Sequence, residues 1–104
     1  ELKLPADLAK LTTLEILRVH YCGLTSMLVA LKIKQLRVLD LSNNYIAEIP
    51  DAINQLDKLE DLLLKFNKLN SITQELNKMT SIEFIDLRFN EFSNRPNWLR
   101  NDIV

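Results

Sequence analysis

Residues 36–46, with the sequence LRVLDLSNNYI, decide how this chain folds, because their pattern returns three more times. The pattern has apolar residues at its first, fourth, sixth and eleventh positions and Asn or Cys at its ninth. It is met again by LEILRVHYCGL at 14–24, LEDLLLKFNKL at 59–69 and IEFIDLRFNEF at 82–92. The four segments start at 14, 36, 59 and 82, so they lie 22, 23 and 23 residues apart. A fixed period of this length indicates a solenoid, in which stacked repeats share one continuous core.

Each repeat predicts one short β-strand. Apolar residues alternate with a variable one, as in LDL at 39–41, so both leucines point inward and Asp40 points outward. Because the chain crosses over and returns one strand further along, we expect a parallel sheet with right-handed crossovers. The return segments are expected to form short helical or 3-10 turns at 51–54 and 73–77, with Pro50 at the first helical position. The expected strands are 16–19, 38–41, 61–64 and 84–87.

On these motifs the chain resembles the leucine-rich-repeat family, and the resemblance covers nearly all of it. The half-repeats between the four segments match as well, as LPADLAKL at 4–11 and IPDAINQL at 49–56 illustrate. The resemblance implies an α/β fold: a right-handed leucine-rich-repeat solenoid with a short-strand parallel sheet on the concave face and short helical or 3-10 turns on the convex side. The Pro-bearing 23-residue form is similar to the repeats of intracellular scaffold proteins in small-GTPase and cell-polarity pathways.

Residues 1–104 are expected to form a single leucine-rich-repeat domain of about four and a half repeats, as part of a longer chain. The sequence opens halfway through a repeat, and Arg95 takes a slot where other repeats have Ile or Met, which indicates that the array ends there. Trp98 and Leu99 are expected to cover part of the last repeat. The alternative is a small protein whose open end is capped by a partner.

The composition argues against most site chemistry. One glycine, Gly23, is too few for a P-loop, a dinucleotide-binding turn or a nucleophile elbow. One Cys and one His exclude an internal disulfide and a zinc site built from those two residue types. Thirteen basic and 14 acidic residues give a net charge of −1, so no overall field favours nucleic acid or an anionic membrane. No apolar run is long enough for a signal-peptide core or a membrane span.

We therefore expect no enzyme activity in this chain, no cofactor or metal, and no nucleic-acid, membrane or small-molecule partner. Acidic pairs such as Glu60 and Asp61 lie on an open sheet, which offers no pocket to separate their pKa values. The single Cys and the absence of a glycosylation sequon favour an intracellular, cytoplasmic location.

The ninth position of the pattern predicts an inward ladder of side chains. Asn44, Asn67 and Asn90 are expected to satisfy backbone groups that are left free where each strand turns away. Cys22 occupies the same rung and is expected to be a small, buried replacement for Asn. The alternative is a reactive thiol beside His20, but a nucleophile also needs an orienting group and a pocket, and His20 is expected to be solvated.

The register also predicts which side chains face outward on the concave sheet. Mixed charge around apolar residues suits a protein surface better than a phosphate backbone. From the start of the strands to the turn after them, the outward columns are Ile16, Val38, Asp61 and Phe84; Arg18, Asp40, Leu63 and Asp86; His20, Ser42, Lys65 and Arg88; and Tyr21, Asn43, Phe66 and Phe89. The candidate partner-binding residues are Leu63, Phe84, Arg18, Asp40, Lys65, Asp61, Asp86, Arg88 and His20.

These candidates have structural alternatives. Arg18 and Asp40 fall on adjacent strands, where they are expected to pair with each other. Phe66 and Phe89 are interpreted as structural packing. Leu63 is the least explained residue, because the middle strand position of this pattern usually faces water, and we therefore take it as the interface anchor.

The sequence thus favours a non-catalytic protein–protein interaction module, a scaffold or adaptor segment that docks a protein partner on its concave face. Two alternatives remain open. The repeats are a structural or assembly element of a large complex, bound through their ends or convex side, or they are the regulatory repeat region of an enzyme.

Overall fold

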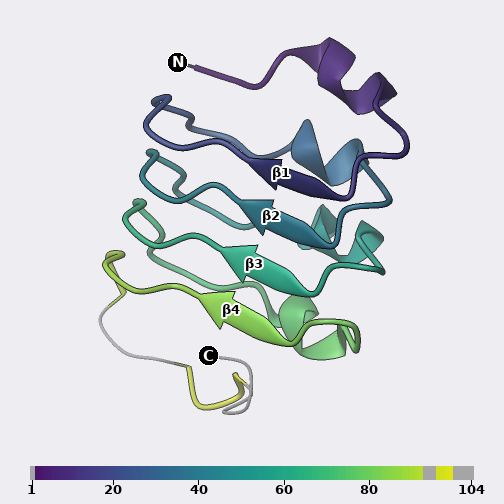
Figure 1. The fold of residues 1–104 in the computed structure, drawn as a ribbon. Helices are drawn as coiled ribbons and strands as arrows, with labels where there is room; N and C mark the ends of the chain where they lie inside the picture. The colour runs from purple at the N-terminus through teal and green to yellow at the C-terminus, as the bar shows by residue number, and fades with distance from the viewer. Residues whose placement is uncertain (1, 93–95, 100–104) are drawn as a thin grey trace.

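The computed structural model describes residues 2–92 and 96–99, over which the chain winds as a solenoid with one short strand in each complete turn (Figure 1). The strands form one parallel sheet in which each pairs with the next along the chain. The four predicted strands are confirmed, and each ends one residue earlier than expected because the chain already turns away from the sheet there. They are β1 (Ile16–Arg18), β2 (Val38–Asp40), β3 (Asp61–Leu63) and β4 (Phe84–Asp86).

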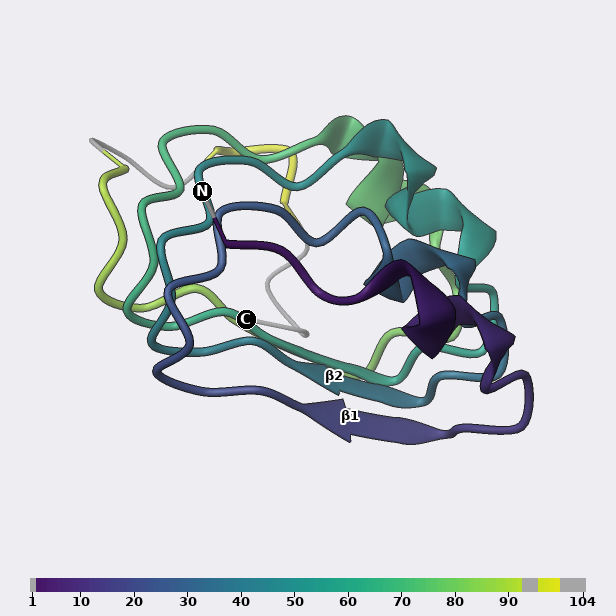
Figure 2. The same cartoon turned by 90° about the horizontal axis from the view of Figure 1, so that it is seen from above.

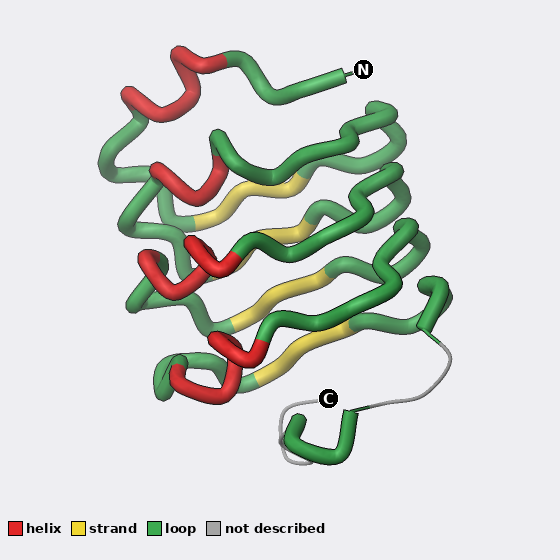
Figure 3. Tube along the Cα trace, turned by 180° about the vertical axis from the view of Figure 1, so that it is seen from behind, coloured by secondary structure: helices red, strands yellow, loops and turns green. Residues whose placement is uncertain are grey.

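Each repeat returns on the opposite side through a short 3-10 helix. Seen from above, the strands line one side of the coil and the helices line the other (Figure 2); seen from behind, the helices stack over one another (Figure 3). The predicted turns are confirmed, but Pro50 lies one residue before its helix, with φ −64° and ψ 151°, rather than at the first helical position. The helices are η1 (Ala6–Lys10), η2 (Ala30–Lys32), η3 (Asp51–Gln55) and η4 (Gln74–Lys78).

The apolar positions of the repeat fill the space between the sheet and the helices. In the middle repeats they are fully buried, as are Leu39 and Leu62 on the strands and Ile53 and Leu56 on the return segment. Leu17 of β1 is only half-buried. The reason is that no other strand of the described residues pairs with the outer edge of β1, so one side of this repeat stays open.

The first residues lie against the turn of the next repeat. Leu2 forms an isolated parallel bridge with Leu24, and the Leu2 carbonyl accepts a hydrogen bond from the Thr25 N–H at 3.1 Å. Gly23 leaves room for the Leu2 side chain in this approach, because a Cβ at this residue would lie 2.9 Å from Leu2 Cδ1 and the end of that side chain would have to shift. Its φ of +68° is also a conformation that glycine adopts without strain.

The last described residues pack against the final repeat. Leu99 is buried, Trp98 is half-buried against the core, and the Trp98 carbonyl accepts a hydrogen bond from Asn77 Nδ2 at 2.6 Å. The prediction that these two residues cover part of the last repeat is therefore confirmed. Arg95, on which the predicted end of the array depended, lies outside the described residues.

Every repeat leaves its strand through a left-handed residue that is not glycine. This conformation is uncommon for residues with a side chain, so the turn must be held by other contacts. The four residues and their φ angles are Tyr21 at 56°, Asn43 at 61°, Phe66 at 58° and Phe89 at 61°.

Candidate interaction surface

The turns after the strands are held by inward asparagine side chains. Asn44 Oδ1 accepts hydrogen bonds from the backbone N–H groups of Cys22 and Leu24, both at 3.1 Å. Its Nδ2 donates to the carbonyls of Val19 at 2.8 Å and Leu41 at 2.9 Å. The side chain therefore joins its own turn to the turn of the preceding repeat.

The same bonds recur along the solenoid. Asn67 accepts from the Ile46 N–H and donates to the Leu41 carbonyl, both at 2.9 Å, and Asn90 makes the equivalent pair of bonds one repeat further. The predicted asparagine ladder is confirmed. These bonds fix the position of each repeat relative to the one before it, and hence the register of the strands in the concave sheet.

Cys22 occupies the expected rung but is not buried. Its thiol donates to the His20 carbonyl at 3.2 Å, which reproduces the bond that Asn44 makes to the carbonyl two residues before it, at 3.3 Å. The side chain is exposed, so the prediction of a buried cysteine is wrong. Each of the other rungs is covered by the repeat before it. Within the described residues no strand lies on the outer side of β1, so the rung of Cys22 stays open to solvent.

The strand pairing places the outward residues in the predicted columns. Ile16, Val38, Asp61 and Phe84 are partners across the sheet, and so are Arg18, Asp40, Leu63 and Asp86. Their exposure differs from the expectation, however, because Asp40, Asp86 and Ser42 are buried. Strands in a sheet lie about 4.8 Å apart, so a short side chain in an inner column is covered by longer ones beside it.

Asp40 is the centre of a charge cluster that joins β1 to β2. Its Oδ2 lies 3.3 Å from Arg18 Nη1 and 2.8 Å from His20 Nε2, and its Oδ1 accepts from the Ser42 N–H at 3.2 Å. Burial acts to raise the pKa of Asp40, but the hydrogen bonds from Ser42 and His20 outweigh it and hold the pKa below its ordinary value. The predicted Arg18–Asp40 pair is confirmed, whereas His20 is a member of this cluster rather than a free surface residue.

Asp86 and Arg88 form a second, self-contained pair at the end of β4. Arg88 Nε and Nη2 each donate to one carboxylate oxygen of Asp86 at 2.9 Å. These bonds lower the pKa of Asp86 the most. Burial acts to raise it, but the Arg88 N–H and the charges of Arg88 and Lys65 lower it further, so the pKa stays below its ordinary value. The charge of Asp86 is thus neutralised within the chain, and it does not act as an open rim charge.

The centre of the sheet retains apolar and unpaired charged residues. Leu63 is half-buried and lies outside the core cluster, and Phe84 on the neighbouring strand is 44% exposed. Asp61 and Lys65, which are half-buried, form no direct ion pair with any described residue. Of the nine candidates, these four therefore make no direct ion pair with a described residue, although the charge of Lys65 also acts on Asp86.

Sequence reasoning missed a charged bridge where the strands begin. Arg37 Nε lies 2.9 Å from Glu60 Oε2, and Arg37 Nη1 lies 3.3 Å from Glu15 Oε1. Hydrogen bonds from Arg37 hold the pKa of Glu60 below its ordinary value. The repeat alignment contained the signal, because these three residues occupy the same position in successive repeats.

The two phenylalanines that were expected to pack structurally form a stacked pair with each other. Phe66 and Phe89 stand at the turns after β3 and β4, with ring centroids 4.4 Å apart and planes 3° apart. Both rings are exposed, at 46% and 64%. They pack against each other at the surface rather than in the core.

Two other kinds of site are absent from the described residues. They contain no group of three or more His, Cys, Asp and Glu residues placed to hold a metal ion. Within the same part of the chain, no helix is both long and apolar enough to cross a membrane.

The comparison with protein families identifies the family of the chain. The family model described as leucine rich repeat matches residues 34–92, which is more than half of the sequence. The chain therefore belongs to the leucine-rich-repeat family. A comparison with curated proteins gives no match.

Solved structures of two bacterial proteins are similar to this chain. A leucine-rich-repeat protein of Leptospira interrogans has 26% sequence identity and a TM-score of 0.80 over 89% of this chain. An internalin of Listeria monocytogenes has 22% identity and a TM-score of 0.77 over 86% of it, and shares the fold. The chain spans about a quarter of the length of these structures, 24% and 26% respectively.

Proposed function

We propose that this chain is a non-catalytic protein–protein interaction module that docks a protein partner on the concave face of its sheet. Membership of the leucine-rich-repeat family supports a protein-binding role, because the stacked strands of a solenoid present an extended surface. The observation that carries the proposal is the position of Leu63 on β3 and Phe84 on the adjacent strand β4, two outward apolar residues in neighbouring columns with the charged Asp61 and Asp86 as their cross-strand partners.

The charges around this centre give the partner an orientation. Asp61 lies in the first outward column, towards the start of the strands, and Lys65 lies in the third, beyond their end. Asp40 and Asp86 are already neutralised by Arg18 and Arg88. A partner segment that places a basic group over Asp61 and an acidic group over Lys65 complements the two charges that remain.

The proposal extends to the setting of the module. We place it as a scaffold or adaptor segment within a longer repeat array, inside the cell and in signalling. The exposed free thiol of Cys22 supports a reducing compartment, where it is protected from oxidative pairing.

The test is to capture partners from an extract of the source cells with the folded protein and its variants. Leu63→Asp should abolish capture, because an apolar anchor at the centre of an interface carries much of the binding energy. Lys65→Glu should weaken capture and reduce its salt dependence. Lys32→Glu, on the exposed return side, is the matched charge control and should have no effect. Retained capture by a folded Leu63→Asp protein would refute binding through this centre.

A second candidate, an assembly element bound through its end, has one observation in its favour. At the β1 end, Leu11 and Ile16 are exposed, at 48% and 54%, and Leu14 and Leu17 are only half-buried. In that case Leu63→Asp and Lys65→Glu would be silent, and Leu11→Asp, at an exposed residue outside the sheet, would abolish capture.

A further inference from the structure

The residues that turn the chain away from the sheet form a column of side chains with one ring missing. Tyr21, Asn43, Phe66 and Phe89 occupy equivalent left-handed positions in successive repeats. The backbone ladder continues into this column, since the Tyr21 N–H donates to the Asn43 carbonyl at 2.9 Å. Phe66 and Phe89 already stack on each other. Asn43 stands where the next ring of the stack would lie.

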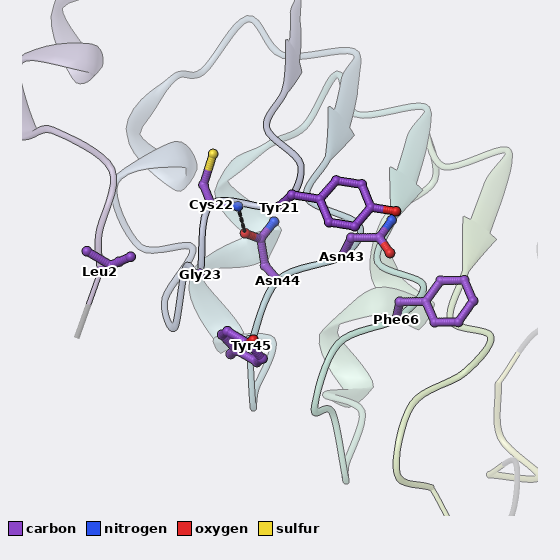
Figure 4. Close-up of a pocket in the computed structure, with 8 residues that line it drawn as sticks. All are labelled: Leu2, Tyr21, Cys22, Gly23, Asn43, Asn44, Tyr45 and Phe66. Carbon is purple, nitrogen blue, oxygen red and sulfur yellow. Dashed lines mark hydrogen bonds between the residues drawn. The ribbon is translucent and has the colours of Figure 1, made fainter.

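Asn43 leaves a slot between the rings of Tyr21 and Phe66. Two strand spacings of about 4.8 Å separate equivalent positions on β1 and β3 by roughly 9.6 Å. A planar ring needs carbon contacts of about 3.5–4.0 Å on each of its faces, so this separation accommodates one ring. Figure 4 shows the Tyr21 and Phe66 rings on either side of the Asn43 side chain, which is shorter than the rings and fills only the base of the slot.

The slot opens into a surface pocket of about 510 Å³. Tyr21 is 81% exposed and Tyr45, at the other side of the pocket, is 58% exposed. Such exposure of large aromatic rings in one place is typical of a docking surface. The pocket is lined by Leu2, Tyr21, Cys22, Gly23, Asn43, Asn44, Tyr45 and Phe66.

We propose that this slot binds an aromatic side chain of a protein partner, as a second docking point at the turn edge of the solenoid. A ring inserted there would complete the column and stack on Tyr21 with one face and on Phe66 with the other. The Asn43 amide at the base of the slot supplies an acceptor for the indole N–H of tryptophan. This point lies beyond the strand ends and is independent of Leu63 and Phe84.

The surrounding charges specify the partner segment further. The eight lining residues include no Asp, Glu, Lys or Arg. The residues that precede the column on the concave side are His20, Ser42, Lys65 and Arg88; His20 and Arg88 already contact Asp40 and Asp86, so Lys65 supplies the available positive charge. Lys65, next to Phe66, has no direct ion pair among the described residues. An aromatic residue flanked by acidic residues therefore fits this edge best.

The probe is the blocked tripeptide Asp-Trp-Asp, titrated into the protein and followed by proton NMR. Its indole resonances should move upfield, because a ring that lies between two others experiences both ring currents. Asp-Leu-Asp should bind at least tenfold more weakly, and Lys-Trp-Lys several-fold more weakly. These two peptides separate the contribution of the ring from that of the charge.

Two substitutions at one position provide the matched control. Asn43→Phe should fill the slot and weaken the binding of Asp-Trp-Asp at least tenfold, since Phe occupies the same backbone conformation at Phe66 and Phe89. Asn43→Gly also suits this conformation, leaves the slot open and should retain binding. Retained binding by Asn43→Phe, or equal binding of the leucine peptide, would overturn the proposal. Tighter binding of single-stranded oligothymidylate or cellobiose, lost in Asn43→Phe, would assign the slot to nucleic acid or sugar instead.

Discussion

At the scale of single residues, the concave surface depends on side chains that do not face it. Asn67 donates to a carbonyl of the preceding repeat and accepts from one of its N–H groups, and it also bonds its own turn through the carbonyl of Leu64. Because these backbone groups are buried, they cannot form hydrogen bonds with water instead. The asparagine is therefore required for the turn. The turn then keeps the backbone of Phe66 in its left-handed conformation.

Asn67→Leu should destabilise the protein strongly. Leaving a buried donor or acceptor without its partner costs about 1–3 kcal/mol, and this substitution leaves several. Asn43→Phe is the control, because it changes the neighbouring position of the turn to a residue that two other repeats carry there. It should change stability by less than about 0.5 kcal/mol. The measurement is urea unfolding, and equal shifts in the two midpoints would contradict the assigned ladder.

At the scale of elements, β1 and β2 are joined by more than backbone bonds. Asp40 of β2 contacts Arg18 of β1 and His20 just beyond it, and all three side chains gather on the concave side. The pKa of Asp40 is lower in the folded chain than its ordinary value of 3.8. The folded state thus binds the proton of Asp40 less readily than the unfolded state does.

This difference predicts an acid-dependent loss of stability. Because the folded pKa is depressed, the contribution of Asp40 is fully present above about pH 3.8 and is lost as pH falls through the lower, folded value. Asp40→Asn should lower the free energy of unfolding at pH 7 and reduce its decline between pH 5 and pH 2, by about 1 kcal/mol or less since the partners are half-exposed. Asp57→Asn, at an exposed residue on a return segment, is the control. An unchanged acid profile in Asp40→Asn would show that the cluster does not contribute.

The elements were largely predictable from sequence, because the repeat supplies its own register. Aligning the four segments gave the strands, the return turns, the asparagine ladder and the outward columns. Exposure was not predictable in the same way. Asp40 and Asp86 lie in the predicted column, yet both are buried: Arg18 and His20 of the preceding repeat contact Asp40, and Arg88 of the same repeat contacts Asp86. The predicted burial of Cys22 was wrong for the opposite reason. No described strand lies beyond β1 to cover its side chain, so Cys22 is exposed.

The alignment of the repeats also did not predict the left-handed backbone conformation of the turns after the strands. Residues as different as Tyr21, Asn43 and Phe66 share one left-handed conformation, and no composition rule for turns selects Phe or Tyr there. The stack of Phe66 on Phe89 follows from that shared conformation together with the spacing of the strands. The stack can therefore be recognised only once the two repeats are placed next to each other in three dimensions.

At the scale of the whole molecule, each side of the solenoid has a different character. The concave sheet carries Leu63 and Phe84 between Asp61 and Lys65, two charged residues that form no direct ion pair with a described residue. The return side has polar bridges between successive repeats, such as Thr73 to Asp51 at 2.6 Å. This asymmetry supports the proposal that a protein partner binds the sheet.

The most direct measurement is site-specific photo-crosslinking to the partner captured from the source cells. A photoreactive benzoyl-phenylalanine replaces Phe84 on the sheet in one protein and Leu28, 55% exposed on the return side, in another. Such a group joins only to molecules that touch it, so it reports the contacting face independently of binding strength. We predict a crosslinked complex from position 84 and none from position 28. A crosslink from position 28 with none from position 84 would contradict binding on the concave face.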